Sequence, residues 1–423
     1  MTEQMNVPKL RFGEFKSHIA EPKKLGQLVD MKSGNTPSKS NPNFWGGAIP
    51  WISASSMKGN VFSESEQNVT QLALENGAKL ATKGSLLLLV RGSMLFNKVP
   101  VGFAGRDVTY NQDVKAINLK NGDDNSYLFY WFKANEYKLL SMVTGTGIGA
   151  GKLDSEELLS LPFHQPKPEE QQKIASFLSK VDEKVALLTE KKDKLTEYKK
   201  GVMQQLFNGK WESKNGQKIF IPPTLRFKAD DGSEFPDWEE KTLGDVSESP
   251  SYGLNSAATK YDGLNKYIRI TDIDEDDRSF SPSPLTSPEE IDDAYLLEEG
   301  DIVFARTGAS VGKSYLYNKD DGRLMFAGFL IKFSVSKANP KFISYQMTTS
   351  QYDNWVKVMS VRSGQPGINA QEYSTYPLNV PCTEEQEQIA NFLSALDYKI
   401  NLTSSELEKA KEWKKGLLQQ MFV

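Results

Sequence analysis

Two stretches of the sequence nearly repeat each other: EEQQKIASFLSKVDEKV from Glu169 and EEQEQIANFLSALDYKI from Glu384. The similarity continues to Phe207 in the first copy and to Phe422 in the second, and 19 of the 39 paired positions are identical. The copies begin 215 residues apart, which is about half of the 423-residue chain. An internal repeat of this length predicts that the architecture itself is duplicated.

Both copies carry apolar residues at alternating spacings of four and three, the heptad pattern of a coiled coil. The pattern predicts two long helices, at about Glu169–Phe207 and Glu384–Phe422, each with one apolar stripe that another helix must cover. A long stretch of chain joins the helices, so we expect them to pair antiparallel. The alternative is a coiled coil that serves oligomerisation. The stripes contain Ile174, Leu178, Val181, Val185, Leu188, Leu195, Val202 and Leu206, and then Ile389, Leu393, Leu396, Ile400, Leu407, Ala410, Leu417 and Met421.

Weaker repeats cover the rest of the chain. VPKLRF from Val7 returns as PPTLRF from Pro222, and KKLGQLV from Lys23 returns as KTLGDVS from Lys241. We interpret the chain as two tandem halves related by a pseudo-two-fold axis, which predicts that Val7–Phe12 packs near the end of the second helix. The expected division is an N-terminal segment at 1–20, a first domain at 21–163, a central long helix at 164–209, a linker at 210–236, a second domain at 237–378 and a C-terminal long helix at 379–423.

Each expected domain has short β-rich runs, such as SLLLLV from Ser85 and DIVFA from Asp301, with turn residues and short helical patterns between them. An α+β fold is therefore expected for both domains. Outside the shared segments the domains differ almost everywhere. Basic residues slightly outnumber acidic ones in the first domain, whereas acidic residues clearly predominate in the second. The same framework thus carries two different surfaces.

The composition argues against several kinds of site. One cysteine, Cys382, and two histidines, His18 and His164, provide no disulfide framework, zinc cluster or histidine-assisted nucleophile. We expect no catalytic, metal-binding or cofactor-binding residue in this chain. Apolar runs such as Leu86–Val90 are too short to span a bilayer, and no signal peptide is recognisable, so a cytoplasmic protein is expected. The net charge of −4 argues only weakly against nucleic acid, because binding depends on where the charges lie.

Three short motifs suggest enzymes but lack essential parts. RTGASVGKS from Arg306 has three residues between its glycines, whereas a phosphate-binding loop needs four. GTGIGA from Gly145 has no βαβ unit or ribose-binding acid in place for a dinucleotide. NPNF from Asn41 lacks the second proline of the amino-methyltransferase loop, and no cofactor motif precedes it.

Taken together, the motifs resemble the specificity subunit of a type I DNA restriction-modification enzyme. The resemblance rests on SGNTPS and FWGGAIPWI in the first domain, on RTGASVGK and SGQPGIN in the second, and on the two helices that begin EEQxxIAxFL. It implies that each globular domain is a target-recognition domain for one half of a split DNA site. It also implies that the helices set the separation and bind methyltransferase subunits, two in number, with restriction subunits as further partners. S-adenosylmethionine, ATP and Mg would then belong to those partner subunits, and the modification would be adenine methylation.

Candidate contact residues follow from this resemblance. Base edges are read by Arg, Lys, Asn, Gln, Ser or Thr, so we expect double-stranded DNA to meet polar residues in glycine-rich loops. The candidates are Ser33, Asn35, Thr36, Lys39, Arg91 and Lys152 in the first domain and Arg269, Arg306, Lys313, Arg362 and Gln365 in the second. On the helices, the resemblance suggests partner contacts at Glu169, Gln172, Phe177, Lys199, Glu384, Glu387, Phe392 and Lys414.

Two other functions remain open at the level of sequence. A coiled-coil adaptor with two ligand-binding domains would need no DNA. A self-sufficient methyltransferase would bind S-adenosylmethionine by itself, but the missing motifs speak against it. The acidic second domain is a difficulty for DNA binding, and we expect acids such as Asp274–Asp277 to face away from DNA.

Overall fold

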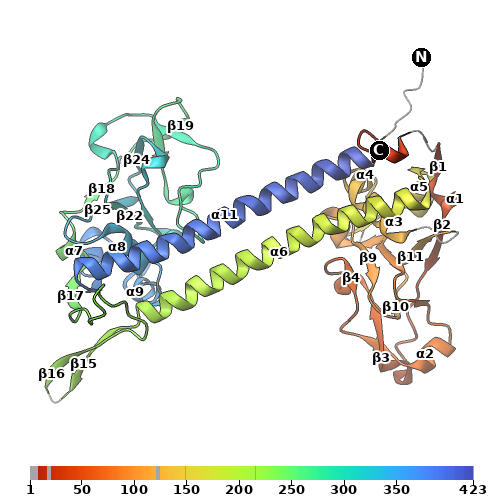
Figure 1. Ribbon diagram of the computed structural model, residues 1–423, viewed down its shortest axis with the longest axis horizontal. Helices are drawn as coiled ribbons and strands as arrows, with labels where there is room; N and C mark the ends of the chain where they lie inside the picture. Colours follow the sequence, from red (N-terminus) through yellow and green to blue (C-terminus); the bar gives the residue numbers. More distant parts are fainter. Residues whose placement is uncertain (1–7, 17–20, 121–123, 148, 215, 423) are drawn as a thin grey trace. The chain divides into compact units, whose positions relative to one another are not determined.

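The computed structural model describes residues 8–16, 21–120, 124–147, 149–214 and 216–422. The chain divides into two compact units: residues 1–190 with 404–423, and residues 191–403. Each unit contains one globular domain and one end of each long helix (Figure 1). Among the described residues, no helix is long and apolar enough to cross a membrane.

The first unit is built on a five-stranded sheet of order β2-β11-β7-β9-β4 and a four-stranded sheet of order β5-β3-β10-β6. Helix α3 lies against β9 and β11 (Figure 1). The elements are β1 (Pro22–Lys24), α1 (Leu25–Leu28), β2 (Val29–Ser33), β3 (Trp45–Ile52), β4 (Val61–Phe62), β5 (Asn68–Val69), α2 (Gln71–Glu75), β6 (Leu80–Ala81), β7 (Leu86–Leu89), β8 (Arg91–Gly92), β9 (Val101–Ala104), β10 (Val108–Tyr110), β11 (Val114–Leu119), α3 (Asn125–Ala134), α4 (Glu136–Ser141), β12 (Thr144–Thr146), β13 (Ala150–Lys152), α5 (Ser155–Ser160) and β14 (Pro162–His164).

The second unit uses a four-stranded sheet of order β18-β25-β22-β23 with several two-stranded ribbons. Its elements are β15 (Lys210–Lys214), β16 (Gln217–Ile221), β17 (Glu239–Thr242), α7 (Leu243–Val246), β18 (Ser251–Tyr252), β19 (Ala258–Lys260), β20 (Lys266–Ile268), β21 (Thr286–Pro288), β22 (Asp301–Ala305), β23 (Ser314–Leu316), β24 (Leu324–Phe326), β25 (Leu330–Ser334), α8 (Pro340–Gln346), α9 (Ser350–Met359), α10 (Ala370–Ser374) and β26 (Pro377–Val380). The α+β prediction is confirmed for both domains.

The central strand of each domain comes from the apolar run recognised in the sequence. All four residues of β7, Leu86–Leu89, are fully buried, and so are four of the five residues of β22, with the fifth, Asp301, nearly so. Strands covered on both faces are expected to read as continuous apolar runs rather than as alternating ones. These strands fix the position of the residues that follow them, Arg91 and Arg306.

The two long helices are α6 (Pro168–Leu206) and α11 (Thr383–Met421), each of 39 residues. In the first unit, Ile174 and Leu178 share a core cluster with Leu417 and Met421. In the second unit, the end of α6 shares a core cluster with the start of α11. The start of each helix thus meets the end of the other, which confirms the antiparallel coiled coil.

The apolar stripe is buried unevenly along its length. At the two ends of α6 the stripe residues are buried within the domain cores, for example Val181 and Val202. In the middle, Val185, Leu188 and Leu195 are only half-buried and belong to neither core. A substitution in the middle of the α6 stripe should therefore lower the stability less than one near its ends, whereas Leu407 and Ala410 in the middle of the α11 stripe are buried.

The segment before each domain is bound to the helices in the same way in both halves. The backbone N–H of Leu10 donates to Gln420 O at 2.9 Å, and that of Leu225 donates to Gln205 O at 3.2 Å. This confirms the predicted packing for residues 8–12, while Val7 lies outside the described residues. Phe12 meets Phe177 edge-on at 5.9 Å between ring centroids.

A buried ion pair accompanies this packing in each half. The Arg11 guanidinium donates to both Glu170 carboxylate oxygens at 2.8 and 2.6 Å. The Arg226 guanidinium donates in the same way to Glu385, at 2.9 and 3.0 Å. Both pairs are separated by 159 residues and follow the 215-residue period. We call these two pairs the arginine clamps.

Each domain begins and ends on one two-stranded ribbon. Strand β1 pairs antiparallel with β14 in the first domain, and β17 pairs antiparallel with β26 in the second. Only three residues separate β14 from α6, and two separate β26 from α11. The helix that follows each domain therefore starts close to the point where that domain began.

Candidate DNA interface

A glycine that packs against backbone opens the candidate loop of each domain. A Cβ atom on Gly34 would lie 2.2 Å from Tyr110 O, and one on Gly253 would lie 2.2 Å from Ala327 O. Such contacts are not possible for real Cβ atoms, so only glycine fits. Glycine-rich loops are expected to let DNA approach the backbone, but at these two positions the domain's own backbone occupies that space.

In the first domain, both the nitrogen and the oxygen of the Asn35 side-chain amide form hydrogen bonds. The side-chain NH₂ donates to Gly77 O at 2.9 Å, and the side-chain oxygen accepts from Lys79 N at 3.0 Å. The Trp51 indole donates to the Asn35 backbone oxygen at 3.1 Å. Asn35 therefore orders this loop within the domain.

The neighbouring candidates are more accessible. The Ser33 hydroxyl accepts from the Lys115 ammonium at 2.8 Å, and the Thr36 hydroxyl donates to the Gln112 side chain at 2.7 Å. All these contacts lie at the surface, and Lys39 is exposed. Lys115 comes from β11 and brings a cation to this loop that the sequence analysis did not consider.

Arg91 and Lys152 are brought together by strand pairing. Strand β8 pairs with β13, and Arg91 lies directly opposite Lys152. Both side chains are exposed, and the Lys152 ammonium lies 3.2 Å from the Asp154 carboxylate. An exposed ion pair of this kind is weak, so Lys152 remains able to exchange its partner for a phosphate.

In the second domain, the stretches RTGAS and SGQPG lie against each other. The Gly308 N–H donates to Pro366 O at 3.0 Å, and Thr307 forms an isolated bridge with Gly367. A Cβ atom on Gly308 would lie 2.9 Å from the Gln365 amide nitrogen. Two segments far apart in sequence therefore form one surface that carries Arg306 and Gln365.

An aromatic ring supports Arg306 on this surface. The guanidinium carbon lies 5.0 Å from the centroid of the Tyr252 ring, a cation–π contact. The Tyr252 hydroxyl accepts from the Ala370 N–H at 3.3 Å, and the Arg306 N–H donates to Phe329 O at 3.1 Å. Phe329 and Tyr252 are both exposed aromatics. We call Tyr252, Arg306 and Gln365 the Arg306 cluster.

Tyr252 and Phe329 are not among the candidates from the sequence, because those candidates are all polar. Tyr252 stands immediately before Gly253, as Ser33 stands immediately before Gly34. Aromatic rings at a DNA groove make apolar contacts, for example with the thymine methyl group. An aromatic residue beside a structurally required glycine was the available signal.

Three other basic candidates are neutralised within the domain. The Arg269 guanidinium donates two bonds of 2.8 Å to Asp272, and that of Arg362 donates two of 2.6 Å to Glu372. The hydrogen bonds that Arg269 donates to Asp272 raise the pKa of the guanidinium. Lys313 is buried and pairs with an exposed glutamate, Glu275. These arrangements favour a structural role for all three cations.

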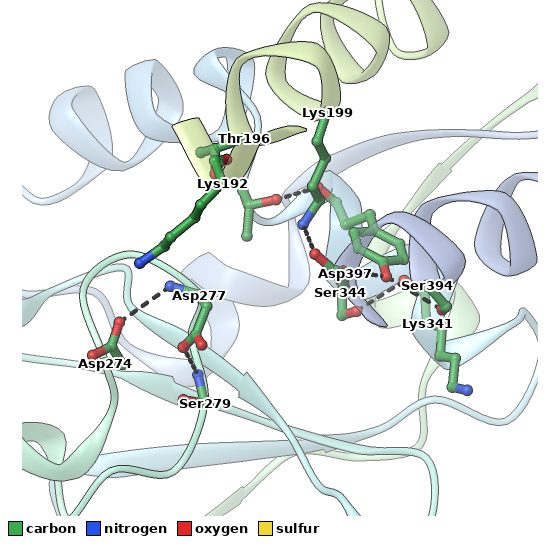
Figure 2. Close-up of polar contacts among 12 residues, drawn as sticks. Lys192, Thr196, Lys199, Asp274, Asp277, Ser279, Lys341, Ser344, Ser394 and Asp397 are labelled. Atoms are coloured by element: carbon green, nitrogen blue, oxygen red, sulfur yellow. Dashed lines mark hydrogen bonds and ion pairs between the residues drawn. The ribbon is translucent and has the colours of Figure 1, made fainter. Parts of the chain in front are cut away.

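The acidic run at 274–277 forms a compact turn. The Asp274 carboxylate accepts from the backbone N–H groups of Asp276 and Asp277 at 2.8 and 3.2 Å, and these bonds lower its pKa. Figure 2 shows the Lys192 side chain of α6 directed toward this turn. That the acidic turn at 274–277 faces away from DNA stays a prediction.

The candidate partner residues on the helices fall into two groups. Phe177 and Phe392 meet rings of the same unit edge-on, and Lys199 and Lys414 pair with aspartates. Glu169, Gln172, Glu384 and Glu387 are exposed. The exposed group offers the more accessible surface for another subunit.

Among the residues that the structure describes, no group of three or more His, Cys, Asp or Glu side chains could hold a metal ion. Cys382 is partly buried, and burial raises the pKa of its thiol. Of the two histidines, His18 lies outside the described residues, and the backbone oxygen of His164 accepts from Tyr127 at 3.0 Å.

Comparison with known proteins gives consistent results. The chain is 30% identical over 199 residues to the Escherichia coli type I restriction enzyme EcoR124I/EcoR124II specificity subunit, covering 45% of this chain and 49% of that protein. It is 24% identical over 406 residues to the Methanocaldococcus jannaschii type I restriction enzyme MjaVIII specificity subunit, covering 93% and 90%. The chain thus spans about half of the first relative and most of the second.

Solved structures show the same fold. The S subunit of the M. genitalium type I restriction-modification system superimposes with a TM-score of 0.57 at 19% identity, over 99% of both chains. A second match, with a TM-score of 0.54 at 12% identity, is a chain from a structural study of the complex assembly and conformational transition of the type I R-M system. It covers 96% of this chain and 97% of that one.

The family described as type I restriction modification DNA specificity domain matches this chain twice, at residues 20–197 and 236–412. Each match covers one globular domain and ends inside one of the long helices. The two matches together account for most of the sequence, and the chain therefore belongs to the type I restriction modification DNA specificity domain family.

Proposed function

We propose that this chain is the DNA sequence-specificity subunit of a type I restriction-modification complex. Each globular domain reads one half of a bipartite, asymmetric DNA site, and the helices set the unread spacer and dock methyltransferase subunits. The chain itself is non-catalytic, and S-adenosylmethionine, ATP and Mg act in the partner subunits. Chromosomal DNA as substrate implies a cytoplasmic location.

One observation supports this proposal best: equivalent loops of the two domains carry different side chains. An arginine follows the buried central strand in both domains, at Arg91 and Arg306, and a close-packed glycine opens a loop in both. The residue before that glycine differs, because it is Ser33 in the first domain and Tyr252 in the second. Unlike side chains on equivalent loops would read unlike half-sites, which is what an asymmetric site requires.

Exchange of one domain tests the proposal. The chain is assembled with its methyltransferase subunit, and methylated adenines are mapped before and after residues 237–377 are replaced by the corresponding domain of a related subunit. We expect one half-site to change while the other half-site and the spacer persist. If both halves change together, the domains form one composite surface and the modular reading is wrong.

Single substitutions make the test more specific. Arg306→Ala should lower discrimination at one position of one half-site by about 1–3 kcal/mol if it contacts a base edge. Arg362→Ala is the matched control, because its guanidinium is already bound by Glu372. No sequence-dependent binding of DNA by the assembled complex at any salt concentration would favour the adaptor. Tight binding of S-adenosylmethionine by the isolated chain would favour the self-sufficient methyltransferase.

A further inference from the structure

A group of four polar residues occurs twice where each domain meets the helices. In the second unit it consists of Tyr345 on α8, Ser394 and Asp397 on α11, and Lys199 on α6. The first unit has the same residue types 215 positions away: Tyr130 on α3, Ser179 and Asp182 on α6, and Lys414 on α11. We call each group a latch.

The latch of the second unit joins three elements through one carboxylate (Figure 2). The Tyr345 hydroxyl donates to Asp397 Oδ2 at 2.7 Å, and the Lys199 ammonium donates to Asp397 Oδ1 at 2.5 Å. The same ammonium lies 5.2 Å from the centroid of the Tyr345 ring. One domain helix and both long helices are therefore connected at a single point.

The latch of the first unit repeats this connection. The Tyr130 hydroxyl donates to Asp182 Oδ2 at 2.9 Å, and Lys414 pairs with Asp182 Oδ1. Burial raises the pKa of Tyr130, as it does that of Tyr345, so both hydroxyls remain protonated donors across the neutral range.

The domains differ almost everywhere between the shared segments, and yet both keep a tyrosine on the helix that faces α6 or α11. Apolar contacts along a heptad stripe tolerate displacement, because a shift of one heptad presents similar residues again. A polar residue with a single matching partner does not tolerate it, and fixing of register is the best-attested use of such groups. Between the latches the stripe of α6 is only half-buried, whereas Leu407 and Ala410 of the α11 stripe are buried, so packing limits displacement less on the α6 side.

We propose that the two latches fix the position of each recognition domain along the helix pair and so select the length of the unread spacer. The inference rests on the proposed function and adds to it a set of positioning residues. Tyr130 and Tyr345 act through Asp182 and Asp397, without contact to DNA. The shared apolar cores still attach each domain to the helices. Loss of a latch should therefore loosen the register between domain and helices without releasing the domain, so that sites with a spacer one base pair longer or shorter become more acceptable.

The test uses the complete complex with its methyltransferase and a set of DNA duplexes. The duplexes carry both half-sites at the preferred spacer, or at a spacer one base pair shorter or longer. Tyr345→Phe should reduce discrimination between spacers about tenfold, the effect of one lost hydrogen bond. Tyr130→Phe with Tyr345→Phe should reduce it further.

Tyr315→Phe is the matched control. The Tyr315 hydroxyl donates to Asp321 at 2.5 Å inside the same domain, and neither residue lies on a long helix. Tyr315→Phe and Tyr345→Phe should both lower thermal stability, but only Tyr345→Phe should alter the spacer preference. Lys199→Arg retains the charge and the donor and should preserve the preference, whereas Lys199→Met should not.

The outcomes distinguish failure of the proposed function from failure of the latch inference. If the wild-type complex methylates no specific sequence, the proposed function is wrong and the latch inference fails with it. If methylation of the site persists and the spacer preference is the same in wild type, Tyr345→Phe and the double variant, the latches are structural contacts only. Relaxed spacing in Tyr315→Phe would likewise overturn the assignment.

Discussion

Replacement of Arg226 by alanine removes one arginine clamp and leaves its partner buried. Glu385 has no exposed side-chain surface, and Arg226 is 12% exposed. The substitution deletes two charge-assisted hydrogen bonds of 2.9 and 3.0 Å. The Trp238 indole, which donates to Glu385 at 3.1 Å, is unaffected.

The expected loss of stability follows from this geometry. Breaking a buried ion pair by removing one partner costs about 3–5 kcal/mol, chiefly because the other charge stays buried. Glu385 keeps one donor, and the cavity left by Arg226 opens toward water, so we expect the lower end of that range. Adding Glu385→Gln removes the unpaired charge and should recover part of the loss.

Hydrogen exchange on the complete chain measures this effect, because the two units need not unfold together. Protection should fall in the second unit of Arg226→Ala and remain unchanged at residues 21–120. In Arg11→Ala, protection should instead fall in the first unit and remain unchanged in the second. A loss below about 1 kcal/mol, or no recovery on adding Glu385→Gln, would refute the view that an unpaired buried charge dominates.

Three further predictions concern single positions. Gly34→Ala should strongly destabilise the first unit, because the new Cβ would overlap backbone atoms. Gly145→Ala should not, because the space around Gly145 is open, and thermal unfolding of the two variants tests the difference. Leu188→Asp places a charge at a half-buried position and should lower the free energy of unfolding by about 2 kcal/mol. Leu187→Asp should lower it little, because Leu187 is 59% exposed, and urea denaturation measures both variants. A hydrogen bond from a neighbouring asparagine side chain, with others from backbone N–H groups, lowers the pKa of Asp262 to about 2. Its contribution to stability should be complete above the unfolded pKa of about 3.9 and lost as the pH falls toward 2, and NMR titration would check the midpoint.

The sequence was sufficient for the features that depend on periodicity. The heptad stripes and the 215-residue repeat predicted both long helices to within one residue at each end, because a narrow apolar stripe has few other ways to be buried. The buried strand at Leu86–Leu89 was equally clear. Packing at Leu10 followed from the repeat alone.

The candidate interface was less predictable, because residue type does not reveal the partner of a polar group. Arg306 and Arg362 look alike in sequence, yet one lies over the Tyr252 ring and the other is bound by Glu372. Asn35 is bound by a loop more than forty residues away. Such partners become known only when the chain is folded.

The division of the chain into two units has a consequence for its synthesis. The core of the first unit includes Leu417, Leu418, Met421 and Phe422, which leave the ribosome only after the whole of residues 191–403. Until then, the apolar surface around Ile174 and Leu178 lacks the part of its cover that α11 supplies, although the rest of its unit was translated long before. A nonsense codon at position 404 would therefore leave the late-made unit with all its residues and the early-made unit with an open core. The structural defect would then lie in the first unit, although the truncation removes only residues made after the second unit.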